Sequence, residues 1–400
     1  MKKAKWYSEK DLRVLSLFSG CGGLDLGFEG GFDVLKHSLP ADLKKDWHPA
    51  LIRNRHFAIL PLTRFKTVFA NDINKQAQII WTKYFSKKFG TNPACFSLES
   101  IVDLVKKHKR GHKNVFPKNI DVLTGGFPCQ DFSTMGSKQR FDSAVNHNGK
   151  MKKSVKRENR GNLYKWMTDV IKIVMPNVFI AENVKGVFFY KEAFSTITKY
   201  FKTNLAKDYF LLEPRLLDFA NYGVPQIRRR LLFVGIKKSA LKKQRPFDFF
   251  PRETHLKKHV TTKQALAGLT EPEISRDLDQ QEYSRSAYCP TYNRSTFETP
   301  MDGPSYTVVA RGDPVFLRLR KELGGKNYKE GMKERRITVR ETSRVQTFPD
   351  DFCFIKNGLK RSGAYYLLGN AVPPLMAWHV ARHLESQWDR VFKKRKKHGA

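Results

Sequence analysis

The sequence is short of acidic residues. Its 400 residues include 38 Asp and Glu against 74 Lys and Arg, which leaves a formal net charge of +36 at pH 7. So large a surplus of positive charge is typical of proteins that bind a polyanion such as nucleic acid. The alternative is a lysine-rich surface that is only solvated, because runs such as residues 393–397 often form soluble tails.

Paired cysteines and long apolar runs are also missing. The five cysteines are scattered without C-x-x-C spacing, so we predict neither a disulfide framework nor a metal site. No stretch approaches the roughly 18 apolar residues of a membrane span, and the basic N-terminus lacks the apolar segment of a secretory signal. We therefore expect a soluble protein of the reducing cytoplasm with no membrane partner.

The third glycine of a dinucleotide-binding fingerprint is absent as well. Residues 12–18 are an apolar run that predicts a strand, and SGCGG then leads into LDLGF, which can begin a helix. A glycine turn before a helix N-terminus suits a nucleotide-like cofactor. Asp25 stands where G-x-G-x-x-G needs its last glycine, which argues against NAD and favours another adenosine-containing cofactor.

A second strand is predicted at residues 67–70, after a segment at 33–66 that shows no clean period and is interpreted as an insertion. Asp72 follows this strand, at the place where such units hold a ribose hydroxyl. Asp72 could instead cap the helix expected over residues 74–85.

The stretch DVLTGGFPCQDFSTMG at residues 121–136 runs from a strand-like entry through two glycines to Cys129. A cysteine at such a junction can be a nucleophile if positive potential favours its thiolate, and otherwise it is a small buried hydrophobe. The polar, basic residues 137–160 that follow are a candidate lid.

Two further predicted strands end in charged residues. Residues 177–181 lead into Glu182, whose pKa desolvation can raise until it acts as an acid near neutral pH, although a structural ion pair is equally consistent. Arg228 and Arg230 precede the apolar residues 231–236, and strand alternation predicts that both point at one phosphate, carboxylate or base oxygen.

The remaining sequence divides into a variable block and a regular end. Residues 237–334 are polar and punctuated by proline, which predicts a small separate domain or an oligomerisation insert. Helices are predicted at residues 163–174, 337–351 and 375–388, the second ended by Pro349. A tight turn is predicted at Gly369 and Asn370.

Six of these stretches, in this order, resemble the motifs of the DNA (cytosine-5) methyltransferases. They are Phe18-Ser19-Gly20-Cys21-Gly22-Gly23, Gly126-Phe127-Pro128-Cys129-Gln130, Glu182-Asn183-Val184, Gln226-x-Arg228-x-Arg230, Arg340-Glu341 with Arg344-x-Gln346-x-Phe348-Pro349, and Gly369-Asn370-x-Val372-Pro373. Each is short, but six in order cover nearly the whole chain.

The resemblance implies an α/β, Rossmann-like S-adenosylmethionine-dependent methyltransferase fold with a mostly parallel twisted sheet and a smaller target-recognition domain. It divides the chain into a catalytic domain at residues 1–236 with the insertion at about 33–66, a target-recognition domain at 237–334, and a segment at 335–400 that returns to the catalytic domain. The enzyme implied is a DNA (cytosine-5-)-methyltransferase of a restriction-modification system.

The resemblance also implies roles for individual residues. Cys129 would add to C6 of cytosine, Glu182 would protonate N3, Arg230 with Arg228 would hold the base carbonyl oxygen, and Asn183 would shape the pocket. Those implied to bind S-adenosyl-L-methionine are Phe18, Ser19, Gly20, Gly22, Gly23, Leu24, Asp72, Ile73, Glu99, Pro128, Asn370 and Val372. Those implied to contact DNA are Gln130, Ser133 and Gln226. One departure is Leu98-Glu99-Ser100-Ile101, where the family usually has Gly-Asp-Ile.

The implied partner is double-stranded DNA, with the target base flipped out and the recognition domain reading base edges in the major groove. A monomer is expected, associated with the nucleoid through DNA, alongside a cognate restriction endonuclease. Three alternatives stay open: the same chemistry on transfer RNA, a catalytically silent DNA-binding homologue, and a nicotinamide enzyme.

Overall fold

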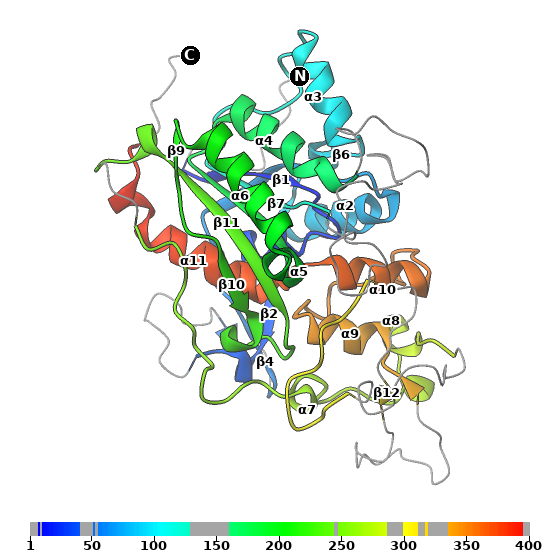
Figure 1. The fold of residues 1–400 in the computed structure, drawn as a ribbon. Helices are drawn as coiled ribbons and strands as arrows, with labels where there is room; N and C mark the ends of the chain where they lie inside the picture. The colour runs from blue at the N-terminus through cyan, green and yellow to red at the C-terminus, as the bar shows by residue number, and fades with distance from the viewer. Residues whose placement is uncertain are drawn as a thin grey trace.

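A computed structural model describes residues 7–8, 10–40, 51–52, 55–128, 160–243, 247–285, 299–310, 317–318 and 335–394. Its centre is an eight-stranded sheet in the order β10-β11-β8-β7-β1-β5-β6, with β9 paired to β11 (Figure 1). The neighbours from β8 to β6 run parallel, whereas β11 is antiparallel to β8, β9 and β10. This mixed, mostly parallel sheet confirms the predicted fold class.

The strand bounds follow the apolar runs of the sequence. They are β1 Leu12–Leu17, β5 Phe65–Asn71, β6 Phe96–Ser97, β7 Val122–Gly126, β8 Val178–Val184, β9 Tyr209–Leu211, β10 Arg215–Asp218 and β11 Arg229–Lys237. The chain passes from β1 to β5 on one side and later to β7 on the other. The sheet order therefore reverses at β1, and ligands of such sheets bind beside that point at the carboxyl ends of the strands.

Helices cover both faces of the sheet, and in Figure 1 α4, α5 and α6 lie in front of it while α11 crosses behind. One face carries α1 Gly23–Glu29, α2 Lys75–Phe89 and α11 Pro374–Val391, and the other carries α3 Ile101–Lys109, α4 Leu163–Val174, α5 Lys185–Phe189 and α6 Lys191–Leu205. Alternation along β1 sends Val14 to the first core and Leu15 and Leu17 to the second. No helix in the described ranges is both long and apolar enough to cross a membrane.

The described part of the insertion before β5 contains a small sheet. Its strands are β2 Asp33–Leu35, β3 Leu51–Ile52 and β4 Phe57–Ile59, paired antiparallel in the order β2-β4-β3. Leu35 and Phe57 pack against Val260 and Ala265 from the block after β11. Strands of two or three residues are too short to produce a readable period, which explains why no strand was predicted there.

Two local predictions near the C-terminus are wrong. The helix expected over residues 337–351 is only α9 Val339–Val345, opened by a capping box of Thr338 and Glu341 and followed by Thr347 at φ 61°. That left-handed residue, not Pro349, marks the turn, and its hydroxyl accepts a hydrogen bond from the Leu375 N–H at 3.1 Å. The predicted tight turn at Gly369 is instead the last turn of α10 Arg361–Asn370.

The variable block keeps contact with the catalytic core. Its described α-helices and strand are α7 Thr262–Ala265, α8 Leu278–Gln281 and β12 Leu317–Arg318, and β12 pairs with β13 Arg335–Arg336. Leu241, Phe249 and Phe250 belong to the same apolar core as α11. The predicted domain boundaries remain a prediction, although these three residues after β11 pack into the catalytic core.

The return of the chain's end depends on a close approach of α11 to α1. A Cβ built on Gly27 of α1 would lie 2.7 Å from the Trp378 backbone nitrogen, and closer still to Ala377 and the Pro374 carbonyl. Only glycine leaves room for α11 at this position.

We therefore expect Gly27→Ala to destabilise the protein by about 2–3 kcal/mol, because helix backbones must separate to admit the methyl group. The change corresponds to a fall in Tm of roughly 5 °C, measured by circular dichroism. Gly303→Ala is the matched control, since a Cβ there meets nothing within 4 Å. Equal Tm values for the two variants would contradict the close-packing argument.

Candidate active site

The predicted site residues that the structure describes gather mainly at one edge of the sheet. Ser19 and Gly20 follow β1, Asp72 follows β5, Phe127 follows β7, and Glu182 lies near the end of β8. These strands are parallel neighbours, so their carboxyl ends place residues far apart in sequence beside one another. Cys129, Gln130 and Ser133 lie outside the described residues.

A buried ion pair stands at the end of β8. The Arg230 Nε is 2.9 Å from Glu182 Oε1, and both residues are buried. Arg230 pairs across the sheet with Val184, so it is the diagonal neighbour of Glu182 on the same face. On the other side, a Cβ on Gly126 would lie 2.8 Å from Glu182 Oε2. Glycine at the end of β7 thus makes the space that the carboxyl group occupies.

The protonation of Glu182 is balanced between two effects. Burial raises its pKa, whereas the positive charges of Arg230 and then Arg228 oppose that rise, and the net direction is upward. Burial also lowers the pKa of Arg230, but a guanidinium stays protonated in proteins. A carboxyl group with a raised pKa beside a fixed positive charge can hold a proton that it then donates to a ligand.

Arg228 has a different role from the one expected of it. Its guanidinium is buried and donates to the carbonyl oxygens of Val308 at 3.0 Å, Gly369 at 2.9 Å and Ala371 at 2.8 Å. The expectation that Arg228 and Arg230 point at one ligand is therefore wrong for Arg228. It precedes β11, so strand alternation does not govern its direction, and it joins three chain segments.

Asn183 and Gln226 also make internal contacts. Asn183 Nδ2 donates to the Phe127 carbonyl at 3.2 Å, and its Oδ1 accepts from the Val184 N–H at 2.8 Å. The end of β8 thereby holds the chain just before Pro128 and residue 129. Gln226 Nε2 donates to Gln346 Oε1 at 2.8 Å, and its Oε1 accepts from the Val308 N–H at 2.9 Å.

The turn after β1 has an unusual backbone. Phe18, Gly20 and Gly22 have φ values of 54°, 55° and 91°. Asp72 accepts hydrogen bonds from the N–H groups of Gly20 and Asn74, each at 2.9 Å. The alternative role for Asp72 as a helix cap is wrong, because Asn74 caps α2.

The other predicted cofactor residues differ in exposure and contacts. The Ser19 hydroxyl donates to the Ser16 hydroxyl at 2.9 Å, and a Cβ on Gly23 would overlap the Val372 carbonyl. Ile73 and Asn370 are exposed, whereas Glu99 is half-buried and ion-paired to Lys107. Leu24 packs at the edge of the first core.

Asn71 Nδ2 donates to the Glu99 carbonyl at 2.7 Å, which holds residue 99 beside the end of β5.

Asp25 and Trp81 are site neighbours that the sequence reasoning missed. Asp25 is buried in the first turn of α1, and its Oδ2 accepts from Trp81 Nε1 at 2.6 Å. Burial raises the pKa of Asp25 to about 6, although hydrogen bonds from Ser16 and Trp81 lower it. The sequence signal was an acidic residue at the apolar start of a helix, which can indicate a buried polar contact. In the sequence analysis, Asp25 served only as an argument against NAD.

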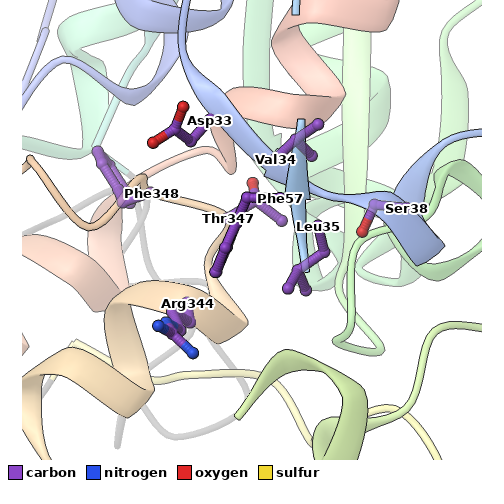
Figure 2. Close-up of a pocket in the computed structure, with 8 residues that line it drawn as sticks. All are labelled: Asp33, Val34, Leu35, Ser38, Phe57, Arg344, Thr347 and Phe348. Atoms are coloured by element: carbon purple, nitrogen blue, oxygen red, sulfur yellow. The ribbon is translucent and has the colours of Figure 1, made fainter. Parts of the chain in front are cut away.

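A small cavity lies between the inserted sheet and the turn after α9, and none of its lining residues was predicted as a site residue. Figure 2 shows the lining residues, which are Asp33, Val34, Leu35, Ser38, Phe57, Arg344, Thr347 and Phe348. Arg344 is held by Asp350, with Nη2 to Oδ2 at 2.6 Å, and its guanidinium lies 4.9 Å from the Phe57 ring centre. The cavity thus belongs to the joint between the insertion and α9.

Comparison with known proteins places these features in a family. The profile of the family described as C-5 cytosine-specific DNA methylase matches residues 12–386. The chain is 30% identical over 400 residues to the Type II methyltransferase M.BspRI of Lysinibacillus sphaericus, which covers 94% of this chain and 82% of that protein. It is 29% identical over 402 residues to M.BsuRI of Bacillus subtilis, which covers 95% and 80%.

Solved structures support the fold. The Dnmt2 methyltransferase of S. pombe has a TM-score of 0.59 at 18% identity, covering 94% of this chain and 99% of that one. The methyltransferase EhMeth of Entamoeba histolytica has a TM-score of 0.59 at 16% identity, covering 95% and 99%. At these identities the likeness concerns the fold alone.

We expect Asp25 to make stability depend on pH. Its folded pKa of about 6 exceeds the ordinary 3.8, so the folded state holds a proton that the unfolded chain has lost, and stability falls as pH rises through this window. From pH 5 to pH 8 this loss is about 1 kcal/mol. Asp25→Asn lacks it, so the Tm of the variant minus that of the wild type should increase over this range in differential scanning calorimetry. A constant difference would show that Asp25 does not titrate there.

Proposed function

This chain belongs to the family of C-5 cytosine-specific DNA methylases, and we propose that it methylates C5 of a flipped-out cytosine in duplex DNA through a covalent bond to Cys129. The observation that carries the proposal is the buried pair of Glu182 and Arg230, placed beside the strand that leads to residue 129. An acid and a fixed positive charge at that edge are what an attack on cytosine requires.

The residues after β1 and β5 fit S-adenosyl-L-methionine. A Cβ on Gly20 would meet nothing within 4 Å, so a ligand can approach the backbone closely there. Asp72 accepts from the N–H groups of Gly20, Asn74 and Ile73, but a carboxylate has about four acceptor sites, which leaves capacity for a ribose hydroxyl. When bound, this cofactor supplies an electrophilic methyl group on a sulfonium. Phe18, Gly22, Asn370 and Val372 would complete the cradle.

The chain's own residues would activate the base. Addition of the Cys129 thiolate to C6 raises electron density at C5, which is otherwise a poor nucleophile. A proton from Glu182 to N3 neutralises the charge that this addition creates, and Arg230 stabilises charge at the carbonyl oxygen while holding Glu182 in place. After the methyl group is transferred, the C5 proton passes to water as the thiolate leaves, and N3 returns its proton to Glu182, which restores the acid and releases the neutral product.

DNA would bind to the same edge. Flipping the base costs a few kcal/mol of stacking and pairing, and the net charge of +36 supplies salt-sensitive attraction for the duplex. We propose that residues 237–334 read the target sequence and that the enzyme acts as a monomer. It would protect host DNA against a cognate endonuclease in the cytoplasm, associated with the nucleoid.

Bisulfite sequencing of DNA from cells that express the chain tests the activity and gives the target sequence at once. We expect protected cytosines at one recurring motif. Incubation with labelled S-adenosylmethionine and either duplex DNA or transfer RNA separates the two substrates. Incorporation into transfer RNA alone would overturn the proposal for DNA.

Cys129→Ala should abolish methyl transfer because no thiolate can add to C6, while cofactor and DNA still bind. Labelled methyl incorporation measures the loss, and fluorescence anisotropy with duplex DNA measures binding. Cys95→Ala is the control, because Cys95 is a buried thiol of the apolar core and burial raises its pKa. Full activity of Cys129→Ala would remove this residue from the mechanism.

Glu182→Gln should lower kcat by about 10²- to 10⁴-fold, since the amide cannot donate a proton as an acid. KM for the cofactor should change little. Glu192→Gln serves as the control because Glu192 is exposed and forms hydrogen bonds with nearby Tyr190 and Ser195. Single-turnover kinetics measures the methyl-transfer step directly, and an unchanged rate would exclude Glu182 as the acid.

A further inference from the structure

We propose that Asp25 is a positioning residue for cofactor binding, because its carboxylate holds the indole of Trp81 beneath the glycine turn after β1. The inference rests on the proposed function, since it concerns the same cradle for S-adenosylmethionine. It assigns a task to a buried acid that the proposed chemistry leaves unused.

The contact between the two side chains is short and dry. Trp81 Nε1 donates to Asp25 Oδ2 at 2.6 Å, and both residues have 0% relative exposure. A buried indole N–H needs an acceptor, and a charged acceptor forms a stronger and shorter bond than a neutral one. Asp25 therefore holds the indole N–H in one direction and satisfies its only polar atom.

Trp81 in turn supports the glycine turn. Its ring stacks on Phe85 with centroids 4.3 Å apart and an angle of 9° between the planes. A Cβ built on Gly22 would lie 2.7 Å from Trp81 Cδ1 and 2.7 Å from Phe85 Cε2. The backbone at Gly22 thus rests directly on the stacked rings, with no space for a side chain between them.

The turn is held from two directions. Asp72 accepts the Gly20 N–H at 2.9 Å on one side, and the rings of Trp81 and Phe85 lie against Gly22 on the other. Gly20 and Gly22 both have left-handed φ values, a conformation that glycine samples freely and that needs outside support to persist. Removing the hydrogen bond from Asp25 loosens one of the two supports.

The experiment compares variants by isothermal titration calorimetry with S-adenosylmethionine. Asp25→Leu, which removes the acceptor but keeps the volume, should weaken binding at least tenfold. Asp25→Asn keeps an oxygen acceptor and should stay within threefold of the wild type. Trp81→Phe keeps an aromatic ring but removes the indole N–H that donates to Asp25, so it should also weaken binding. The double variant Asp25→Leu, Trp81→Phe should be no weaker than the worse single variant.

Two controls separate positioning from general damage. Glu29→Gln alters another buried acid of α1, which pairs with Lys66 at 2.8 Å instead of supporting the turn, so it should lower Tm without changing cofactor affinity. Affinity for duplex DNA should be unchanged in all variants. In steady-state assays, Asp25→Leu should raise KM for the cofactor and leave kcat largely intact.

The outcomes distinguish the inference from the proposed function. If the wild type binds S-adenosylmethionine and both Asp25→Leu and Trp81→Phe bind it with the same affinity as the wild type, only the inference is overturned. Should Asp25→Leu fail to fold, Trp81→Phe decides alone, and normal affinity in that variant overturns the inference. Absence of cofactor binding by the wild type overturns both proposals. Loss of affinity in Asp25→Asn equal to that in Asp25→Leu would also contradict the role of an acceptor.

Discussion

The buried ion pair of Glu182 and Arg230 is the constraint on which the arrangement of the site depends. Two charges withdrawn from water are costly unless each satisfies the other, and removing one partner of such a pair costs about 3–5 kcal/mol. The pair therefore requires β11 to lie beside β8 in one register and β7 to end in a glycine. Burying this pair lowers the free energy of unfolding, but it keeps an acid and a positive charge at the edge where the base would bind.

The buried guanidinium of Arg228 links this part of the sheet to two other segments of the chain. Arg228 donates to carbonyl oxygens of segments around residues 308, 369 and 371, and these come from the variable block and from the chain's end. The close packing of α11 against Gly27 of α1 is a second contact that holds the chain's end on the catalytic core. Parts of the chain that are distant in sequence thus form one wall of the cradle, so a change in the C-terminal segment can affect a site built mainly by the first half.

Sequence alone predicted what depends on local chemistry. The apolar run that became β1, the helix Leu163–Val174 and the carboxyl-end position of Glu182 follow from periodicity and from the topology of parallel sheets. It could not predict where Arg228 points, because that direction depends on carbonyl groups about 80 and 140 residues away. It missed the contact between Asp25 and Trp81 for the same reason, and the inserted sheet because its strands are so short.

The proposed mechanism depends on a transient bond between the sulfur of residue 129 and C6 of an extruded cytosine. A duplex carrying 5-fluorocytosine at the methylated position tests it, because fluorine at C5 cannot leave as a proton does and the intermediate is trapped. With S-adenosylmethionine present, we predict one covalent adduct, mapped by peptide mass spectrometry to Cys129. Absence of any adduct while the unmodified duplex is methylated under the same conditions would contradict the mechanism.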